Sequence, residues 1–374
     1  MYIFHFGRHP KLSLKEVQTR YPEIHISLDG NLGITDSPLK NPQDIQKNLG
    51  GTIMISHLIS TIPTSHVEDM ASILSEYIQE NRDTEHKIKI GISSNIKKYT
   101  NFGFDLKRLL KENNISCRIV TSRNGTLNTG HILREKLLTK GLHIWILEKN
   151  GNISLSHTVS VQDIDAYGLR DYEKPFRDAK TGMLPPKLAQ MMINFSYPAQ
   201  KILDPFCGTG TVILEGMNMG KETDGSDVSP KLIEGCKKNV EWYKQYISPS
   251  YNPHIFVHDA QRINTIQKKY DAIVTEGYLG PIYIKYPDTN TQKMNFKDLE
   301  QLYTKFLSSA EQILKKNGKI IITFPAYHKK GTYNSFFKTF EKHLKNTGFT
   351  LDSQPLIYGR DDQVVWREII ILRY

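Results

Sequence analysis

Residues 201–211 read Lys201-Ile202-Leu203-Asp204-Pro205-Phe206-Cys207-Gly208-Thr209-Gly210-Thr211, and residues 212–215 continue as Val212-Ile213-Leu214-Glu215. The pattern predicts a strand that ends in an acidic residue, then a glycine-rich turn and the start of a helix. Gly208 and Gly210 let the backbone approach a ligand more closely than a side chain would permit. The free N–H groups and the positive dipole end of the new helix favour an anionic group on that ligand. The stretch therefore predicts an α/β fold with a ligand site at a strand end.

Two common nucleotide-binding loops are disfavoured by the same stretch. A dinucleotide fingerprint needs G-x-G-x-x-G, and Ile213 occupies its third glycine position. The phosphate-cradling pattern G-x-x-x-x-G-K-[ST] occurs nowhere in the chain.

Two more acidic residues follow predicted strands further along the chain. Asp227 ends Gly225-Ser226-Asp227-Val228 and lies 227 − 204 = 23 residues after Asp204, near the spacing at which α/β nucleotide folds place an acid on ribose hydroxyls. Asp259 lies in Ile255-Phe256-Val257-His258-Asp259-Ala260, a third predicted strand that ends in an acid, and is placed to accept a hydrogen bond from an adenine amino group. The alternatives are that Asp227 caps the helix 230–243, for which Ser229 is the better N-cap, and that Asp259 is a solvated turn residue. The neighbouring side chains expected to line the same site are Phe206, Thr211, Val228 and Ala260.

The bulk composition bounds the remaining possibilities. The chain has 374 residues, enough for two or three domains, and a net charge of +10 that favours a polyanionic partner. Its three cysteines include no C-x-x-C pair, so neither a disulfide framework nor a structural zinc site is expected, and no bound metal is expected. The N-terminus lacks the features of a signal peptide and no apolar run is long enough to cross a membrane, which predicts a cytoplasmic protein.

The element order predicts several α/β units. Residues 1–62 read as strand, helix, strand, strand, helix, strand, which predicts a ferredoxin-like unit. A second α/β unit is predicted at 63–160 and a more polar linker at 161–182. From 183 to 374, helices alternate with short apolar strands as a parallel sheet requires, and 364–372 is expected to pair antiparallel with about 351–358.

Two motifs carry a family resemblance. Asp204–Thr211 resembles the first motif of methyltransferases that modify exocyclic amines of nucleobases, and Arg177–Ala189 resembles the preceding segment of archaeal-type tRNA guanine-N2 methyltransferases. The resemblance implies a Rossmann-like class I methyltransferase domain at 183–374 that uses S-adenosylmethionine. It also implies that 63–160 is a THUMP-like RNA-binding domain and that Thr181 and Met183 lie at the methionine end of the cofactor.

The sequence departs from that family at the catalytic motif, Asp/Asn-Pro-Pro-Tyr/Phe. After the strand 270–274 it reads Thr275-Glu276-Gly277-Tyr278. Either Glu276 supplies the missing carboxylate, or Thr275 Oγ and backbone carbonyls orient the target amine, or activity is lost. Tyr278 is expected to stack on the target base, the alternative being packing at the rim of the sheet.

Residues 87–123 are the expected RNA-binding surface. They contain nine Lys or Arg and two Asp or Glu, hence 9 − 2 = +7, interleaved with Tyr99, Phe102 and Phe104 as stacking surfaces. The alternative is a solvated helix face with Phe104 in the core. The basic residues expected to contact phosphate are Lys97, Lys98, Lys107, Arg108 and Arg123.

The leading hypothesis from these features is methyl transfer from S-adenosylmethionine to guanine N2 in tRNA or another structured RNA. Its rivals are a DNA amino-methyltransferase, a non-catalytic RNA-binding protein that retains the fold and, more remotely, a small-molecule methyltransferase. The basic N-terminal half argues against the last of these, which would not need it.

Overall fold

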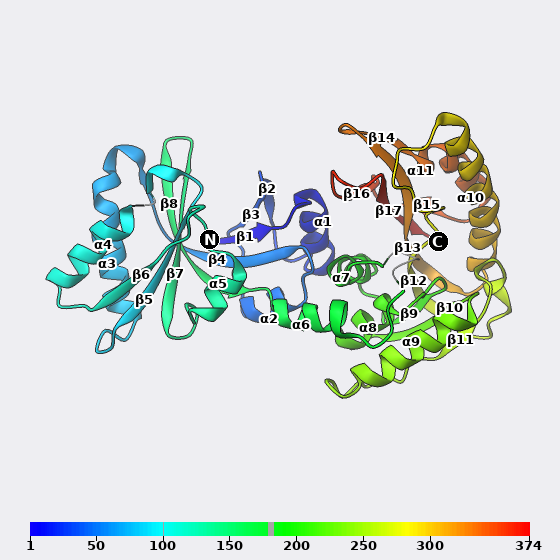
Figure 1. Cartoon of the computed structure of the whole chain (residues 1–374), viewed down its shortest axis with the longest axis horizontal. Coiled ribbons are helices and arrows are strands. Elements are labelled where there is room, and N and C mark those ends of the chain that lie inside the picture. The colour runs from blue at the N-terminus through cyan, green and yellow to red at the C-terminus, as the bar shows by residue number, and fades with distance from the viewer. Residues whose placement is uncertain (100, 179–182) are drawn as a thin grey trace. The chain divides into compact units, whose positions relative to one another are not determined.

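The computed structural model describes residues 1–99, 101–178 and 183–374 (Figure 1). The contacts divide the chain into two compact units. The first contains Met1–Pro10, Glu23–Lys47 and Thr52–Ile164, and the second contains Lys11–Pro22, Asn48–Gly51 and Asp165–Tyr374. The regions predicted as two separate domains, 1–62 and 63–160, therefore fall largely into one unit, while two short N-terminal segments belong to the second.

The first unit is built on one eight-stranded sheet in the order β2-β3-β1-β4-β8-β7-β5-β6. The long strands β4 and β8 pair antiparallel and join the two predicted regions into a single sheet. The strands are β1 (Tyr2–Phe6), β2 (Ser27–Asp29), β3 (Leu32–Thr35), β4 (Thr52–Pro63), β5 (Ile88–Ser94), β6 (Cys117–Val120), β7 (Gly141–Lys149) and β8 (Asn152–Val161). The helices are α2 (Pro42–Lys47), α3 (Met70–Asn81), α4 (Phe102–Glu112) and α5 (Thr129–Arg134).

The second unit is built on a sheet with the order β11-β10-β9-β12-β13-β17-β15, to which β14 and β16 are added. Strands β9 to β13 are parallel, and β17 runs antiparallel to β13. The predicted antiparallel pairing near the C-terminus is confirmed, because β17 pairs with β15 and β16. The strands are β9 (Lys201–Asp204), β10 (Glu222–Asp227), β11 (Ile255–Val257), β12 (Tyr270–Glu276), β13 (Leu314–Lys329), β14 (Thr332–Ser335), β15 (Thr350–Leu351), β16 (Leu356–Tyr358) and β17 (Val365–Arg373).

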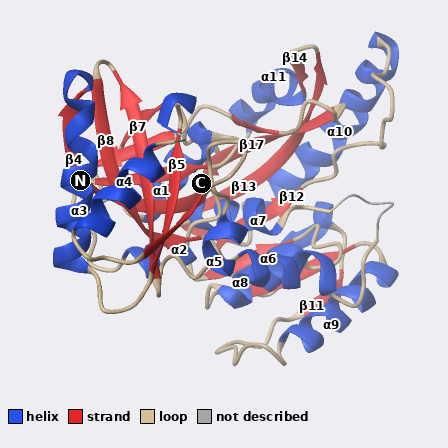
Figure 2. Ribbon diagram, turned by 60° about the vertical axis from the view of Figure 1, so that its left-hand side comes forward, coloured by secondary structure: helices blue, strands red, loops and turns tan. Residues whose placement is uncertain are grey.

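Helices cover both faces of this second sheet (Figure 2). Successive strand residues point to opposite faces, so Ile202 and Ile321 pack with α7 while Leu203 and Ile320 pack with α10 and α11. The helices are α1 (Pro10–Arg20), α6 (Ile164–Gly168), α7 (Pro186–Phe195), α8 (Thr211–Asn218), α9 (Pro230–Tyr243), α10 (Thr289–Ala310) and α11 (Phe336–Phe340). Across the described ranges, no helix combines the length and apolar character needed to cross a bilayer.

The described part of the predicted linker is folded onto α8 and α9. Arg170 Nε donates to Glu215 Oε1 at 2.5 Å, and both side chains are almost fully buried. Asn239 of α9 bonds to the backbone N–H and C=O of Phe176. Polar composition suggested a linker here, but these polar groups are satisfied by one another inside the second unit.

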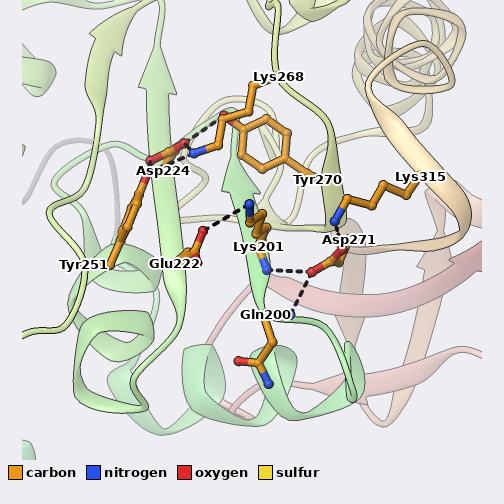
Figure 3. Close-up of polar contacts among 9 residues, drawn as sticks. All are labelled: Gln200, Lys201, Glu222, Asp224, Tyr251, Lys268, Tyr270, Asp271 and Lys315. Atoms are coloured by element: carbon orange, nitrogen blue, oxygen red, sulfur yellow. Dashed lines mark hydrogen bonds and ion pairs between the residues drawn. The ribbon is translucent and has the colours of Figure 1, made fainter.

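A polar cluster fixes the amino-terminal side of the second sheet (Figure 3). The fully buried Asp224 carboxylate accepts hydrogen bonds from Lys268 Nζ at 2.6 Å, Tyr251 Oη at 2.7 Å and Tyr270 Oη at 2.9 Å. Burial by itself raises the pKa of Asp224, but these bonds bring it below its ordinary value. Asp271 similarly accepts from the backbone N–H of Lys201 at 2.8 Å. The strand starts are thus held by protein groups, which leaves the opposite sheet edge for a ligand.

Candidate functional site

A cavity of about 1110 Å³ lies at the carboxyl ends of β9, β10, β11 and β12. Parallel strands bring their carboxyl ends to one sheet edge, which is where open α/β sheets bind ligands. Typical small-molecule pockets measure about 300–1,000 Å³, so this one has room for a nucleoside cofactor and a further base. Its lining includes Met183, Asp204, Phe206, Gly208, Thr211, Asp227, Val228, Asp259, Ala260, Glu276 and Tyr278, all of which had been predicted as site residues.

The loop after β9 forms the floor of this cavity. Asp204 is buried and accepts hydrogen bonds from Thr275 Oγ1 at 2.5 Å and from the Phe206 N–H at 3.2 Å. Burial raises the pKa of Asp204 to about 7, despite these stabilising bonds. Gly208 has a left-handed φ of +52° and borders the cavity, so this turn favours a residue without a side chain.

Gly210 serves a different purpose from the one expected. It does not line the cavity. Its φ is +89°, and an added Cβ would stand 2.5 Å from Cys236 Sγ on α9. The glycine is therefore required for close packing of the loop on α9, whereas its predicted role was close approach to the ligand.

Asp227 and Asp259 border the same cavity from neighbouring strand ends. Asp227 accepts from the Gly208 N–H at 3.0 Å through Oδ2 and from the Ser229 N–H at 2.9 Å through Oδ1, which ties the glycine loop to β10. Ser229 caps α9, as expected, by accepting from the Leu232 N–H. Asp259 accepts from the Gln261 N–H at 2.9 Å and so caps the short helix that follows it. Each carboxylate oxygen has two lone pairs, so both residues keep acceptor capacity towards a ligand.

The segment after β12 divides its side chains between the sheet and the cavity. Thr275 is fully buried, does not line the cavity and commits its hydroxyl to Asp204. Glu276 reaches the cavity, where its Oε1 accepts a hydrogen bond from Arg367 Nε. Of the two predicted ways to replace the motif's acid, the placement favours Glu276.

Tyr278 and its backbone are positioned by Tyr303 of α10. Tyr303 Oη donates to the Tyr278 carbonyl at 2.7 Å, and a Cβ on Gly277 would collide with this hydroxyl. The Tyr278 side chain is 53% exposed and lines the cavity, so it is not packed away at the rim of the sheet. An accessible ring beside the cavity is available for stacking on a base.

Several cavity residues had not been predicted. Arg367 lies in the apolar strand near the C-terminus, where a charged residue among apolar ones was the sequence feature that could have indicated a site residue. The loop after Tyr278 also contributes, and it exposes the large apolar side chains of Ile282 and Ile284, the latter 93% exposed. The predicted Thr181 lies outside the described residues.

The basic stretch of the first unit is only partly a free surface. Tyr99 and Phe102, predicted to stack on bases, are buried in the core instead. Phe104, by contrast, is 75% exposed on α4. Lys98 forms an ion pair with Glu148 at 2.7 Å, and Arg108 lies 3.5 Å from Asp105. Lys107 and Arg123 are exposed at the surface.

Comparison with known proteins agrees with this architecture. Residues 170–352 match the family described as the RMKL-like methyltransferase domain. The chain is 26% identical over 308 residues to a tRNA (guanine(10)-N2)-dimethyltransferase of Methanothermobacter thermautotrophicus, covering 79% of this chain and 78% of that protein. It is 32% identical over 147 residues to the protein of the same name from Pyrococcus abyssi, covering 38% and 39%. Among solved structures, TrmN from Thermus thermophilus aligns over 100% of this chain and 99% of its own with a TM-score of 0.56 at 15% identity. The predicted fold class, a Rossmann-like methyltransferase sheet preceded by α/β structure, is confirmed.

Proposed function

We propose that the protein, whose residues 170–352 match the RMKL-like methyltransferase domain, transfers a methyl group from S-adenosylmethionine to N2 of a guanine in tRNA. The observation that carries the proposal is that Asp204, Asp227, Asp259 and Glu276, from four adjacent strand ends, border one cavity. The names of the two tRNA (guanine(10)-N2)-dimethyltransferase relatives support the choice of substrate.

The chemistry of the cavity fits the cofactor. Asp227 offers acceptors for ribose hydroxyls, and Asp259 offers one for an amino group on adenine. The N-terminus of α8 at Thr211 faces the cavity and suits the methionine carboxylate. When bound, S-adenosylmethionine supplies a methyl group on a sulfonium that already reacts with nucleophiles, so the protein's contribution is mainly to position the acceptor.

Glu276 and Tyr278 provide that positioning. Tyr278 stacks on the flipped base, and Glu276 accepts a hydrogen bond from the exocyclic amine. This orients the nitrogen lone pair towards the methyl carbon. On accepting the methyl group the nitrogen would become cationic and release a proton, for which the Glu276 carboxylate would be the adjacent acceptor.

The first unit is the proposed tRNA-binding part, as a ferredoxin-like region followed by a THUMP-like region. The support for it is the excess of positive charge over 87–123 and the exposed ring of Phe104 beside Lys107 and Arg108 on α4. A cytoplasmic location, together with its tRNA substrate, is part of the proposal.

The proposal is tested with labelled S-adenosylmethionine and unmodified total tRNA, followed by mass spectrometry of the nucleosides. N2-methylated guanosine is expected, and label entering duplex DNA but not tRNA would favour a DNA amino-methyltransferase instead. Asp227→Ala should weaken cofactor binding by about 10–100-fold in calorimetry, since it removes charged hydrogen bonds. Glu234→Gln, on the exposed face of α9, is the matched control. Tight tRNA binding by a wild-type protein that does not bind S-adenosylmethionine would refute the enzyme assignment.

A further inference from the structure

Arg367 of β17 reaches the cavity wall next to the proposed catalytic carboxylate. It lies opposite Pro325 of β13 in the antiparallel register. Its Nε donates to Glu276 Oε1, and its Nη2 lies 3.5 Å from the Met183 carbonyl oxygen. Arg367, Glu276 and Met183 all line the cavity. A residue from the last strand thereby completes a site otherwise built from the loops after β9 to β12.

The ion pair is poorly placed to serve only as a stabilising contact. The Arg367 and Glu276 side chains are just 11% and 19% exposed, and desolvating two such charges offsets most of their attraction. Within the described ranges, Glu276 Oε2 and Arg367 Nη1 have no hydrogen-bond partner. Each side chain therefore keeps a charged group with which it can contact a ligand.

These two remaining groups match one nucleobase edge. The Watson–Crick edge of guanine presents two adjacent N–H donors, on N2 and N1, and then the O6 acceptor. A carboxylate beside a guanidinium presents the complementary order of acceptors and donors. Adenine and cytosine place an unprotonated ring nitrogen next to their amine, and its lone pair would face the carboxylate.

We infer that Arg367 is a specificity-determining residue that, with Glu276, selects guanine by donating to O6 while Glu276 accepts from N1–H and N2–H. The inference rests on the proposed function and adds to it the means by which the base is chosen. Arg367 also holds Glu276 in place, so its effect includes positioning.

Two other arginine–carboxylate ion pairs of the second unit lie away from the cavity, unlike the Arg367–Glu276 pair. The Arg170–Glu215 pair is more deeply buried, and neither residue lines the cavity. Arg373, on the same strand as Arg367, pairs with Asp352 at the surface and away from the cavity lining. Arg373→Gln is therefore a matched control for Arg367→Gln.

The test compares tRNA carrying guanosine at the methylated position with tRNA carrying 2-aminopurine there, which keeps the N2 amine but lacks O6 and N1–H. Two quantities are measured, kcat/KM for methylation and Kd for tRNA with S-adenosylhomocysteine present. Wild type should prefer guanosine by about 100-fold in kcat/KM and also in Kd, the effect expected of losing one or two hydrogen bonds to charged groups. Arg367→Gln should lose at least 10-fold more on guanosine than on 2-aminopurine, so that the preference shrinks. Arg367→Lys should retain part of it, and Arg373→Gln all of it.

Each outcome has a distinct meaning. Equal losses by Arg367→Gln on both substrates, with cofactor affinity unchanged, would overturn base selection by Arg367 and leave it a merely positioning role. A wild-type enzyme that shows no preference in Kd would overturn the inference as well. If wild type does not methylate guanosine N2 in any tRNA, the proposed function itself fails, which is a separate result from the first two.

Discussion

Replacing Gly210 with alanine tests the reason for the second glycine of the loop. The substitution forces an L-residue into a left-handed conformation, which costs about 1–2 kcal/mol. It also places a methyl group 2.5 Å from the Sγ atom of Cys236, whose side chain is fully buried in the core. Overpacking of this kind adds about 1–3 kcal/mol. The expected loss in the free energy of unfolding of the second unit is therefore about 2–5 kcal/mol.

Three further variants separate the conformational part of that loss from the steric part. Gly220 has a similar φ of +67° but open space where a Cβ would be, so Gly220→Ala should lose only the conformational part. Cys236→Ala removes the colliding sulfur, so the double variant Gly210→Ala/Cys236→Ala should be more stable than the sum of the single losses predicts. Urea denaturation followed by tryptophan fluorescence measures the wild type and all four variants. A Gly210→Ala variant as stable as Gly220→Ala, without coupling to Cys236, would refute the packing explanation.

Asp224→Asn should lower the free energy of unfolding by about 2–3 kcal/mol, because it removes the negative charge that accepts buried hydrogen bonds from Lys268 and Tyr270. Glu222→Gln, at a surface ion pair, should change it by less than about 0.5 kcal/mol. Urea titrations measure both variants. Burial lowers the pKa of His143 from 6.5 to about 3. The buried neutral imidazole therefore stabilises the fold fully above pH 6.5, and this stabilisation is lost at about 1.4 kcal/mol per pH unit as the pH falls from 6.5 towards 3. His143→Gln should flatten the acid limb of a curve of unfolding free energy against pH, whereas replacing an exposed histidine with glutamine should not. In the tRNA methylation assay, Thr275→Val should reduce kcat by less than about 10-fold, because the Thr275 hydroxyl bonds to Asp204, whereas Glu276→Gln should reduce it by at least about 100-fold. A larger loss from Thr275→Val than from Glu276→Gln would show that the Thr275 hydroxyl orients the guanine amine.

The sequence predicted the parts of the site that local patterns specify. A strand followed by an acid and a glycine turn is encoded within a dozen residues, so Asp204, Asp227 and Asp259 could be assigned to one sheet edge. Arg367 could not, because its place beside Glu276 depends on how a strand 91 residues later pairs with β13. Phe102 was misassigned because a helix with basic residues on one face can still bury aromatic residues on the other, and Tyr99 because the short turn Lys97–Tyr99 before that helix buries its ring. The division of the chain into units was equally non-local, since it depends on the pairing of β4 with β8.

The end of β12 places one polar side chain in the core and the next in the cavity. The Thr275 hydroxyl lies 2.5 Å from the buried Asp204 carboxylate and donates a hydrogen bond to it. Glu276 is the next residue, and the alternation of the strand turns its side chain to the cavity, where Arg367 balances its charge. Among the described lining residues, five are acidic, Asp362 among them, and Arg367 is the one Lys or Arg. A protein of net charge +10 thus surrounds an acidic cavity, which attracts a sulfonium and repels phosphate. The backbone of an RNA substrate is therefore expected to remain on the basic surface while its base alone enters the site.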